Sequence, residues 1–243
     1  YNMARWTFAG SAGVVAGPLA LSAIVALGLG WRGLFAGFAG LTVLLLVWAW
    51  RAPYRNGNGE APEHPDIKAG VAGVWRMLRE GPALRWLTLL QFSDLMLDVL
   101  LGYLALYMVD VVGVTPSQAG TAIAVWTGVG LLGDFLLIPL LKRVSGLRYL
   151  RLSALLELFL FPTFLLAPSL MLKLVVLALL GLLNAGWYSI LMAQLYSSLP
   201  GRSGTVMAID NLFGLVGALI PWGLGLIAQR FGLRVTMWLL WLG

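Results

Sequence analysis

The acidic residues inside long apolar runs are the side chains of this sequence best suited to chemistry. Of ten Asp and Glu residues, five lie within such runs: Asp94, Asp98, Asp134, Glu157 and Asp210. A carboxylate inside a bilayer costs at least about 2.5–3.5 kcal/mol on insertion scales. No Lys or Arg lies deep within any run. These groups must therefore be protonated, hydrated in a cavity, or paired with a cationic ligand or a base from another part of the protein.

The pair Asp94 and Asp98 is the first candidate for proton coupling. The two residues are four apart, about 6 Å along one helix face, and Gln91 extends that face. Two nearby carboxylates in a low dielectric resist ionising together, so their titration is coupled, as a proton carrier requires. The alternative is that one Asp hydrogen-bonds a neighbouring helix as a protonated acid. Asp134 is the next candidate for proton coupling.

A second polar face is expected further along the chain. Asn184, Trp187, Leu191 and Gln194 follow at spacings of 3, 4 and 3, and Tyr188 is adjacent. This face fits two interpretations, the wall of a substrate cavity and a stripe of hydrogen bonds between helices. Asp210 lies near the start of its run, where it suits contacts that gate a pathway. Glu157 suggests only a buried hydrogen bond.

Several classes of site are excluded by residue content. There is no cysteine, and the one histidine, His64, lies in a Pro-rich segment, so we expect no disulfide, thiolate or histidine metal site. The sequence lacks the Gly-x-x-x-x-Gly-Lys-Ser/Thr phosphate loop, and no cofactor is expected. The basic residues lie in short loops and form no patch, which argues against nucleic-acid binding.

The elements that must position these residues are membrane-spanning helices. Hydrophobic residues make up 60% of the 243 positions and charged residues 11%, whereas a soluble domain carries about 25% charged residues. Seven complete apolar runs and a partial eighth are separated by turn signals such as Thr115-Pro116-Ser117 and Pro168-Ser169. The runs have no alternating period, so they predict an all-α, polytopic integral membrane helical bundle. They cover residues 6–28, 32–50, 86–109, 118–141, 152–167, 170–195, 205–228 and 235–243.

The basic residues orient the predicted bundle. The Lys and Arg residues divide twelve to four between the two sides of the membrane, which places the longest loop, 51–85, in the cytoplasm. The four on the outer side are Arg32, Lys173, Arg230 and Arg234. Arg230 and Arg234 lie against this trend. Within the loop, residues 67–79 predict a short amphipathic helix. It suits either the inner membrane surface or the role of a packed linker.

An internal repeat relates the first and seventh runs. The first reads Gly10-x-x-Gly13-x-x-x-Gly17-Pro18 and the seventh Gly214-x-x-Gly217-x-x-x-Pro221, about 200 residues later. The two runs are six helices apart and share one predicted orientation. This arrangement is that of a parallel repeat of six helices, as in major facilitator superfamily halves.

Two motifs carry a resemblance to that superfamily. The segment "GSAGVVAGPL" at 10–19 resembles the fifth-helix motif of its drug:proton antiporter group, with Gly13, Gly17 and Pro18 at the motif positions. Where the motif continues with two glycines, this chain has Leu21 and Ser22. The segment 130–151 resembles the loop motif between helices eight and nine, here without the usual Asp before its basic residues. That loop supplies Lys142, Arg143, Gly146 and Arg148.

The resemblance implies a secondary transporter of twelve helices, of which this chain covers helices five to twelve. Residues 1–51 would be the last two helices of the N-terminal bundle, 52–84 the cytoplasmic central loop, and 85–243 the C-terminal bundle, truncated in its last helix. Because helices seven and ten line the central cavity in this family, Asp94, Asp98, Asn184, Trp187 and Gln194 are expected to face substrate. The glycines and Pro18 would bend the fifth helix, and the basic residues of the loop motif would hold a gate shut on one face of the membrane.

The function that follows is alternating-access transport in the cell membrane, with proton-coupled efflux of a small organic molecule as the leading hypothesis. Its partners would be that molecule, protons, the lipid bilayer and the missing N-terminal helices. Three alternatives remain: an uptake permease for a sugar or other metabolite, a membrane-embedded lipid-modifying enzyme, and a non-transporting sensor. The enzyme would need a convergent cluster such as His with Asp, or a Ser nucleophile with a base; with His64 in a linker and no cysteine, only carboxylate chemistry remains to it.

Overall fold

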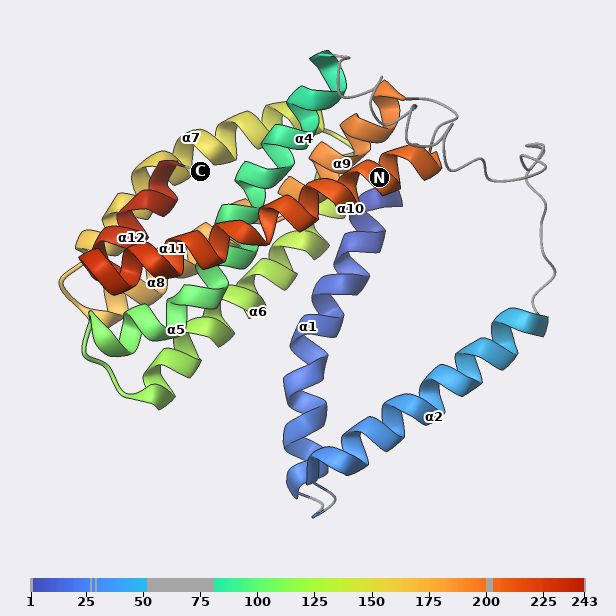
Figure 1. Ribbon diagram of the computed structural model, residues 1–243, viewed down its shortest axis with the longest axis horizontal. Helices are drawn as coiled ribbons and strands as arrows, with labels where there is room; N and C mark the ends of the chain where they lie inside the picture. Colours follow the sequence, from blue (N-terminus) through green and yellow to red (C-terminus); the bar gives the residue numbers. More distant parts are fainter. Residues whose placement is uncertain (1, 27, 29, 52–80, 200–202, 243) are drawn as a thin grey trace.

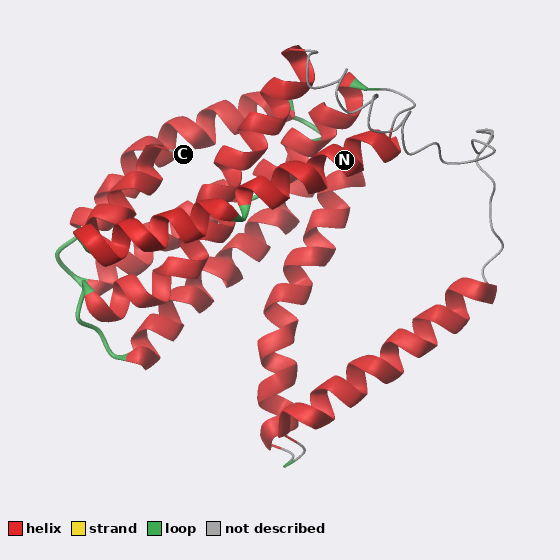
Figure 2. Cartoon of the chain, viewed as in Figure 1, coloured by secondary structure: helices red, strands yellow, loops and turns green. Residues whose placement is uncertain are grey.

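The protein is helical throughout the part of the chain that can be placed. A computed structural model describes residues 2–26, 28, 30–51, 81–199 and 203–242, and within these ranges Figure 2 shows helices and short loops with no strand. The expected all-α class is confirmed. The predicted amphipathic helix at 67–79 lies outside the described residues, as does most of the segment 52–84.

Each membrane-length segment runs antiparallel to the one before it through the main bundle, and several of these segments consist of two consecutive helices (Figure 1). In chain order the elements are α1 (Asn2–Ala26), α2 (Gly30–Arg51), α4 (Gly81–Asp94), a π-helical turn (Leu95–Val99), α5 (Leu100–Asp110), α6 (Pro116–Leu140), α7 (Gly146–Leu166), α8 (Leu170–Asn184), α9 (Trp187–Ser198), α10 (Ser203–Gly217), α11 (Leu219–Phe231), α12 (Leu233–Leu239) and a 3-10 turn (Leu240–Leu242).

Several of these elements are long and apolar enough to cross a membrane. A helix rises 1.5 Å per residue, so the 25 residues of α6 extend about 37 Å, more than the hydrocarbon core of about 30 Å. The polytopic membrane class is therefore confirmed. Among the described residues, five segments meet the criteria of length and composition: Ala83–Asp110, Pro116–Leu140, Gly146–Leu166, Leu170–Ser198 and Val206–Phe231.

Turn residues set the helix boundaries as the sequence predicts. At the start of α6 the Thr115 hydroxyl accepts from the Gln118 backbone N–H at 3.3 Å, and Gln118 Oε1 accepts from the Thr115 N–H at 3.0 Å. This reciprocal capping satisfies two backbone donors, while Pro116 has no N–H to satisfy. Ser169 caps α8 by accepting from the Leu172 N–H at 3.3 Å.

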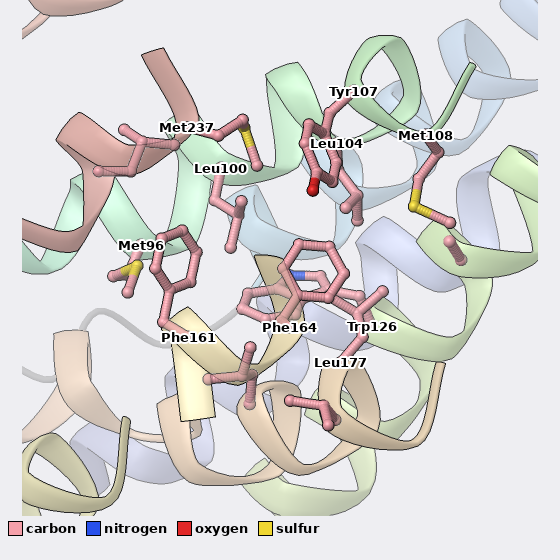
Figure 3. Close-up of a cluster of buried hydrophobic side chains, with 14 of the residues drawn as sticks. Met96, Leu100, Leu104, Tyr107, Met108, Trp126, Phe161, Phe164, Leu177 and Met237 are labelled. Atoms are coloured by element: carbon pink, nitrogen blue, oxygen red, sulfur yellow. The ribbon is translucent and has the colours of Figure 1, made fainter. Parts of the chain in front are cut away.

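Two apolar clusters hold the bundle together, one toward each end. The larger joins α5, α6, α7, α8 and α12 around fully buried residues such as Leu100, Leu104 and Phe164 (Figure 3). The smaller joins α4, α9 and α10 through Leu87, Leu191 and Val206. By contrast, large apolar side chains such as Phe159 are exposed on the outside, as expected of a surface that faces lipid.

Small residues let α6 and α8 cross at close range. A Cβ atom on Gly181 would lie 2.7 Å from the Trp126 carbonyl oxygen, and one on Gly133 would lie 2.7 Å from the Ala185 Cβ. Neither position has room for a larger side chain. Close approach through glycine is a common way for membrane helices to pack, because van der Waals contact replaces the missing hydrophobic drive.

The first two helices stand apart from the others in how they pack. α1 lies against α6 and α9, whereas α2 contacts α1 and extends away from the bundle (Figure 1). Many side chains of α2 are exposed, including Trp48 and Trp50. α1 is continuous through Gly13, Gly17 and Pro18, and a Cβ on either glycine would meet no atom within 4 Å. Close helix contacts are made at other glycines instead, such as Gly133 and Gly181.

Candidate functional site

A central cavity of about 330 Å³ lies where α1, α6, α8 and α9 meet the α4–α5 segment. Its wall combines three carboxyl groups with hydroxyl, amide and aromatic side chains. None of its lining residues is Lys or Arg. They are Thr7, Ser11, Val14, Asp94, Leu97, Asp98, Leu101, Trp126, Thr127, Gly130, Leu131, Asp134, Gly181, Asn184, Ala185, Gly186 and Tyr188.

Asp94 and Asp98 both line this cavity, the first directly before an irregular helical turn and the second within it. Asp94 ends α4, and Asp98 lies in the π-helical turn, where the Leu100 N–H bonds to the Leu95 carbonyl oxygen five residues back. A π-helical turn inserts an extra residue into a helix and is found often at functional sites. Asp94 and Asp98 keep a common side, because residues four apart remain about one turn apart in this geometry, whereas Gln91, expected on the same face, lies outside the cavity lining.

Two further polar groups lie close to this pair. Tyr188 lines the same cavity as Asp94 and Asp98, and Asp210 is near enough to Asp94 and Tyr188 to interact with them electrostatically. Asp210 comes from the middle of α10 and Tyr188 from the first turn of α9. The tertiary structure therefore gathers into one acidic cluster residues that the sequence analysis assigned to separate roles.

Asp134 is held by two different elements. Its Oδ2 accepts from the Ser11 hydroxyl of α1, and its Oδ1 accepts from the Gly186 backbone N–H at 3.1 Å. The side chain is 7% exposed. Because Gly186 precedes α9, the carboxylate lies at a helix N-terminus, where the helix dipole favours negative charge. Asp134 thus fastens α1 and α6 to the start of α9.

The helix expected to carry a continuous polar face is broken. α8 ends at Asn184 and α9 begins at Trp187, with a turn at Ala185 and Gly186 in which Gly186 has a φ of +78°. The predicted face from Asn184 through Gln194 is therefore wrong as one helical stripe, because the positive φ at Gly186 redirects the chain. Asn184 remains in the cavity wall, buried, with both amide atoms unpartnered among the described residues.

Three of the proposed substrate-cavity residues lie elsewhere. Trp187 is buried and its Nε1 donates to the Ser153 hydroxyl of α7 at 2.8 Å. Gln91 packs against Gly217 and lines a separate small cavity between α4 and the α10–α11 segment. Gln194 is half-buried outside the lining of the central cavity. Tyr188 does line the cavity, with its ring 6.3 Å from that of Trp6.

Comparison with family models identifies the fold to which this site belongs. The model described as Major Facilitator Superfamily matches residues 1–221. The chain belongs to the major facilitator superfamily. No curated protein matches it in a sequence comparison. Membership in this family makes the protein a multi-pass secondary transporter of a small molecule, and the expectation of a transporter of this superfamily is confirmed.

The loop motif of this superfamily member forms the turn between α6 and α7. Lys142, Arg143 and Arg148 are exposed there, outside the central cavity. Gly146 begins α7, and a Cβ at this position would lie 3.1 Å from the Ile190 Cγ2 of α9. The glycine of the motif therefore permits α7 to start close against α9. The gating role of the basic residues stays a prediction.

Sequence reasoning missed three hydroxyl residues of the transporter's cavity wall and misjudged one lysine. Thr7, Ser11 and Thr127 line the cavity, and Ser11 reaches Asp134 across 123 positions of the chain. A hydroxyl within an apolar run was the available signal, although only tertiary contact could reveal its partner. Lys173, counted with the outer loops, is the fourth residue of α8 and is only 5% exposed.

Proposed function

We propose that this transporter exports a small organic molecule in exchange for protons. The observation that carries the proposal is the central cavity, whose described wall contains Asp94, Asp98 and Asp134 and no basic residue. Carboxyl groups within a bilayer are rare and usually mark a substrate or proton pathway. Without a fixed cation nearby, their charge is compensated either by bound protons or by a positively charged substrate.

That competition supplies a mechanism for exchange. A proton on Asp94 or Asp98 neutralises the site, whereas a cationic organic molecule binds the ionised carboxylate after that proton has left, so proton and substrate occupy the site in turn. Because Asp98 and Asp210 both act on Asp94, loading one group with a proton changes the others, so the cluster responds as a unit. A proton entering from one side of the membrane then promotes release of substrate on that side.

The cavity favours a modest organic substrate. Its volume of about 330 Å³ is at the lower end of ordinary ligand pockets. Trp126 and Tyr188 offer aromatic surface, which suits a planar or cationic group, while Asn184 and Thr127 offer hydrogen bonds. Export rather than uptake is supported by the resemblance of residues 10–19 to the fifth-helix motif of drug:proton antiporters.

The proposed topology follows the superfamily plan. In it, α1 and α2 close an N-terminal bundle whose first four helices complete the cavity, residues 52–84 form the cytoplasmic central loop, and the later helices form the C-terminal bundle. The gate would include the α6–α7 turn, and alternating access would rock the bundles about the central cavity. We place the protein in the cell membrane, with the end at which α4 begins toward the cytoplasm.

The proposal is tested by transport in cells that lack their own efflux pumps. Cells producing the full-length protein would be loaded with fluorescent organic cations and followed with and without a protonophore. The variant Asp98→Asn removes one cavity charge at nearly constant volume. The matched control is Asp110→Asn, because Asp110 is an exposed carboxylate at the end of α5 outside the cavity.

Wild-type and Asp110→Asn cells should accumulate little of the fluorescent cations. Accumulation should rise when the protonophore is added, and it should be high in Asp98→Asn cells with or without the protonophore. If accumulation is the same with and without the protein across the panel, the cation-export proposal is wrong. Higher accumulation in producing cells, abolished by Asp98→Asn, would instead favour an uptake permease that uses the same acidic cluster.

A further inference from the structure

A second cavity, here called the end cavity, lies away from the acidic cluster. It has a volume of about 340 Å³ and is formed where α5 and α7 end and α8 and α12 begin. These helix ends gather at one end of the bundle (Figure 1). The end cavity shares no lining residue with the central cavity. Its wall includes two cations, Lys173 and Arg234, together with Tyr107 and Trp238.

Lys173 is a buried cation that points into this cavity from α8. Its Nζ donates to the carbonyl oxygens of Phe164 and Leu165, at 2.7 and 3.1 Å. These carbonyls belong to the last turn of α7, where the helix dipole is negative and stabilises a cation. An ammonium group has three donors, so two carbonyls leave one for a further acceptor. The rings of Phe164 and Tyr107 lie 5.2 and 5.6 Å from Nζ and add cation–π attraction.

Arg234 brings a second positive charge to the same space. It lies in the first turn of α12, is exposed, and is close enough that its charge acts on both Lys173 and Tyr107. None of the residues that line the end cavity is acidic; Asp110, the last residue of α5, is outside this lining. Two cations that face one cavity without an anion repel each other, and a bound anion would relieve that repulsion.

The residues that line the end cavity indicate what kind of molecule bears the bound anion. Beside the two cations the cavity is bounded by Val111, Val112 and Leu166, and the last of these is 71% exposed. A charged recess that opens beside apolar surface suits a phosphate group on an acyl chain. Basic pockets between membrane helices bind lipid headgroups in this manner. The guanidinium can take two phosphate oxygens and the remaining ammonium donor a third.

We propose that the end cavity binds a phosphate-type anion between Lys173 and Arg234, and that its source is the headgroup of a membrane phospholipid. Such a ligand would join α5, α7, α8 and α12 at this end of the bundle. It also accounts for two basic residues on the side of the membrane where the distribution of Lys and Arg leaves few. The site is independent of the proposed transport reaction.

The test measures ligand-dependent stability of the purified full-length protein. After delipidation in a neutral detergent, the midpoint of thermal unfolding would be followed during titration with phosphatidylglycerol, with phosphatidylcholine, or with inorganic phosphate. Arg234→Gln removes the exposed cation without opening the core. Arg148→Gln is the matched control, since Arg148 is an exposed cation at the start of α7, at the opposite end of that helix.

Phosphatidylglycerol should raise the midpoint saturably in wild-type protein and in Arg148→Gln. In Arg234→Gln the concentration needed should rise about tenfold or more, because a hydrogen-bonded charge pair is lost. Arg234→Lys should restore part of the effect. A rise with inorganic phosphate that also depends on Arg234 would support the site with free phosphate as its source. If neither ligand shifts the midpoint, or if Arg234→Gln behaves as Arg148→Gln does, the proposal is wrong.

Discussion

Replacing Gly186 by Ala would test the idea that one backbone position shapes the central cavity. Gly186 separates α8 from α9 at a φ of +78°, and a Cβ there would lie 1.8 Å from Cδ2 of Leu137 on α6. A left-handed residue with a Cβ costs about 1–2 kcal/mol, and overpacking of a tight contact about 1–3 kcal/mol. The expected loss in the free energy of unfolding is therefore about 2–5 kcal/mol.

The assay is equilibrium unfolding of the full-length protein in detergent micelles, combined with the transport measurement. Gly102→Ala is the matched control, because Gly102 lies in α5 and a Cβ there meets no atom within 4 Å. This control should leave stability unchanged or raise it slightly, as expected for alanine in a helix. Transport should fall in Gly186→Ala alone, since Asn184 and the Asp134 contact depend on the break.

A double variant separates the two causes of the loss. Leu137 is 2% exposed, so Leu137→Ala by itself should cost about 2–5 kcal/mol. In the double variant with Gly186→Ala the clash is absent. Its loss in the free energy of unfolding should therefore be smaller than the sum of the losses in the two single variants. Additive costs would show that Leu137 is not the obstacle. Equal stability and transport in Gly186→Ala and Gly102→Ala would refute the whole argument.

Further substitutions test two buried carboxyl groups, those of Asp134 and Glu157. Asp134→Asn should lower the free energy of unfolding by about 1–3 kcal/mol, because one of its two accepted hydrogen bonds is lost. Ser11→Ala should add little to that loss, and fully additive costs in the double variant would contradict the α1–α6 contact. Glu157 is 2% exposed and neither carboxyl oxygen has a partner among the described residues. Glu157→Gln keeps its size and removes any buried charge, so thermal unfolding at pH 7 should be unchanged or occur at a higher temperature; a clear drop would reveal a partner for Glu157.

The membrane class and the helix boundaries could be predicted from sequence because both depend on local properties. Apolar run length fixes whether a helix can span a bilayer, and the capping residue Thr115 and the proline at 116 end one element and start the next. The position of Asp94 and Asp98 on one face also follows from local geometry. The same reasoning could not anticipate the π-helical turn that follows Asp94 and contains Asp98, which adds one residue to the helical ladder without a sequence pattern of its own.

The site itself is only partly a local property. The sequence offered Asp134, Asn184 and Tyr188 as candidates, and all three line the cavity. It also offered Trp187, whose indole instead turns toward Ser153 on α7. The difference arises because side chains past Gly186 no longer follow the register of α8. A single positive φ therefore decides which of several polar residues faces the cavity.

What the sequence by itself determined is an all-helical membrane protein with carboxyl groups in its spans and no base deep within them, because composition and run length need no long-range contact. Only the tertiary structure decided how those groups combine. Asp134 meets Ser11 across 123 positions, and Asp94 shares its surroundings with Asp210 of α10. Lys173 and Arg234, counted in separate loops by the sequence, face one cavity. Such pairings depend on helix packing through close contacts such as that at Gly181, and a helical pattern does not specify its neighbours.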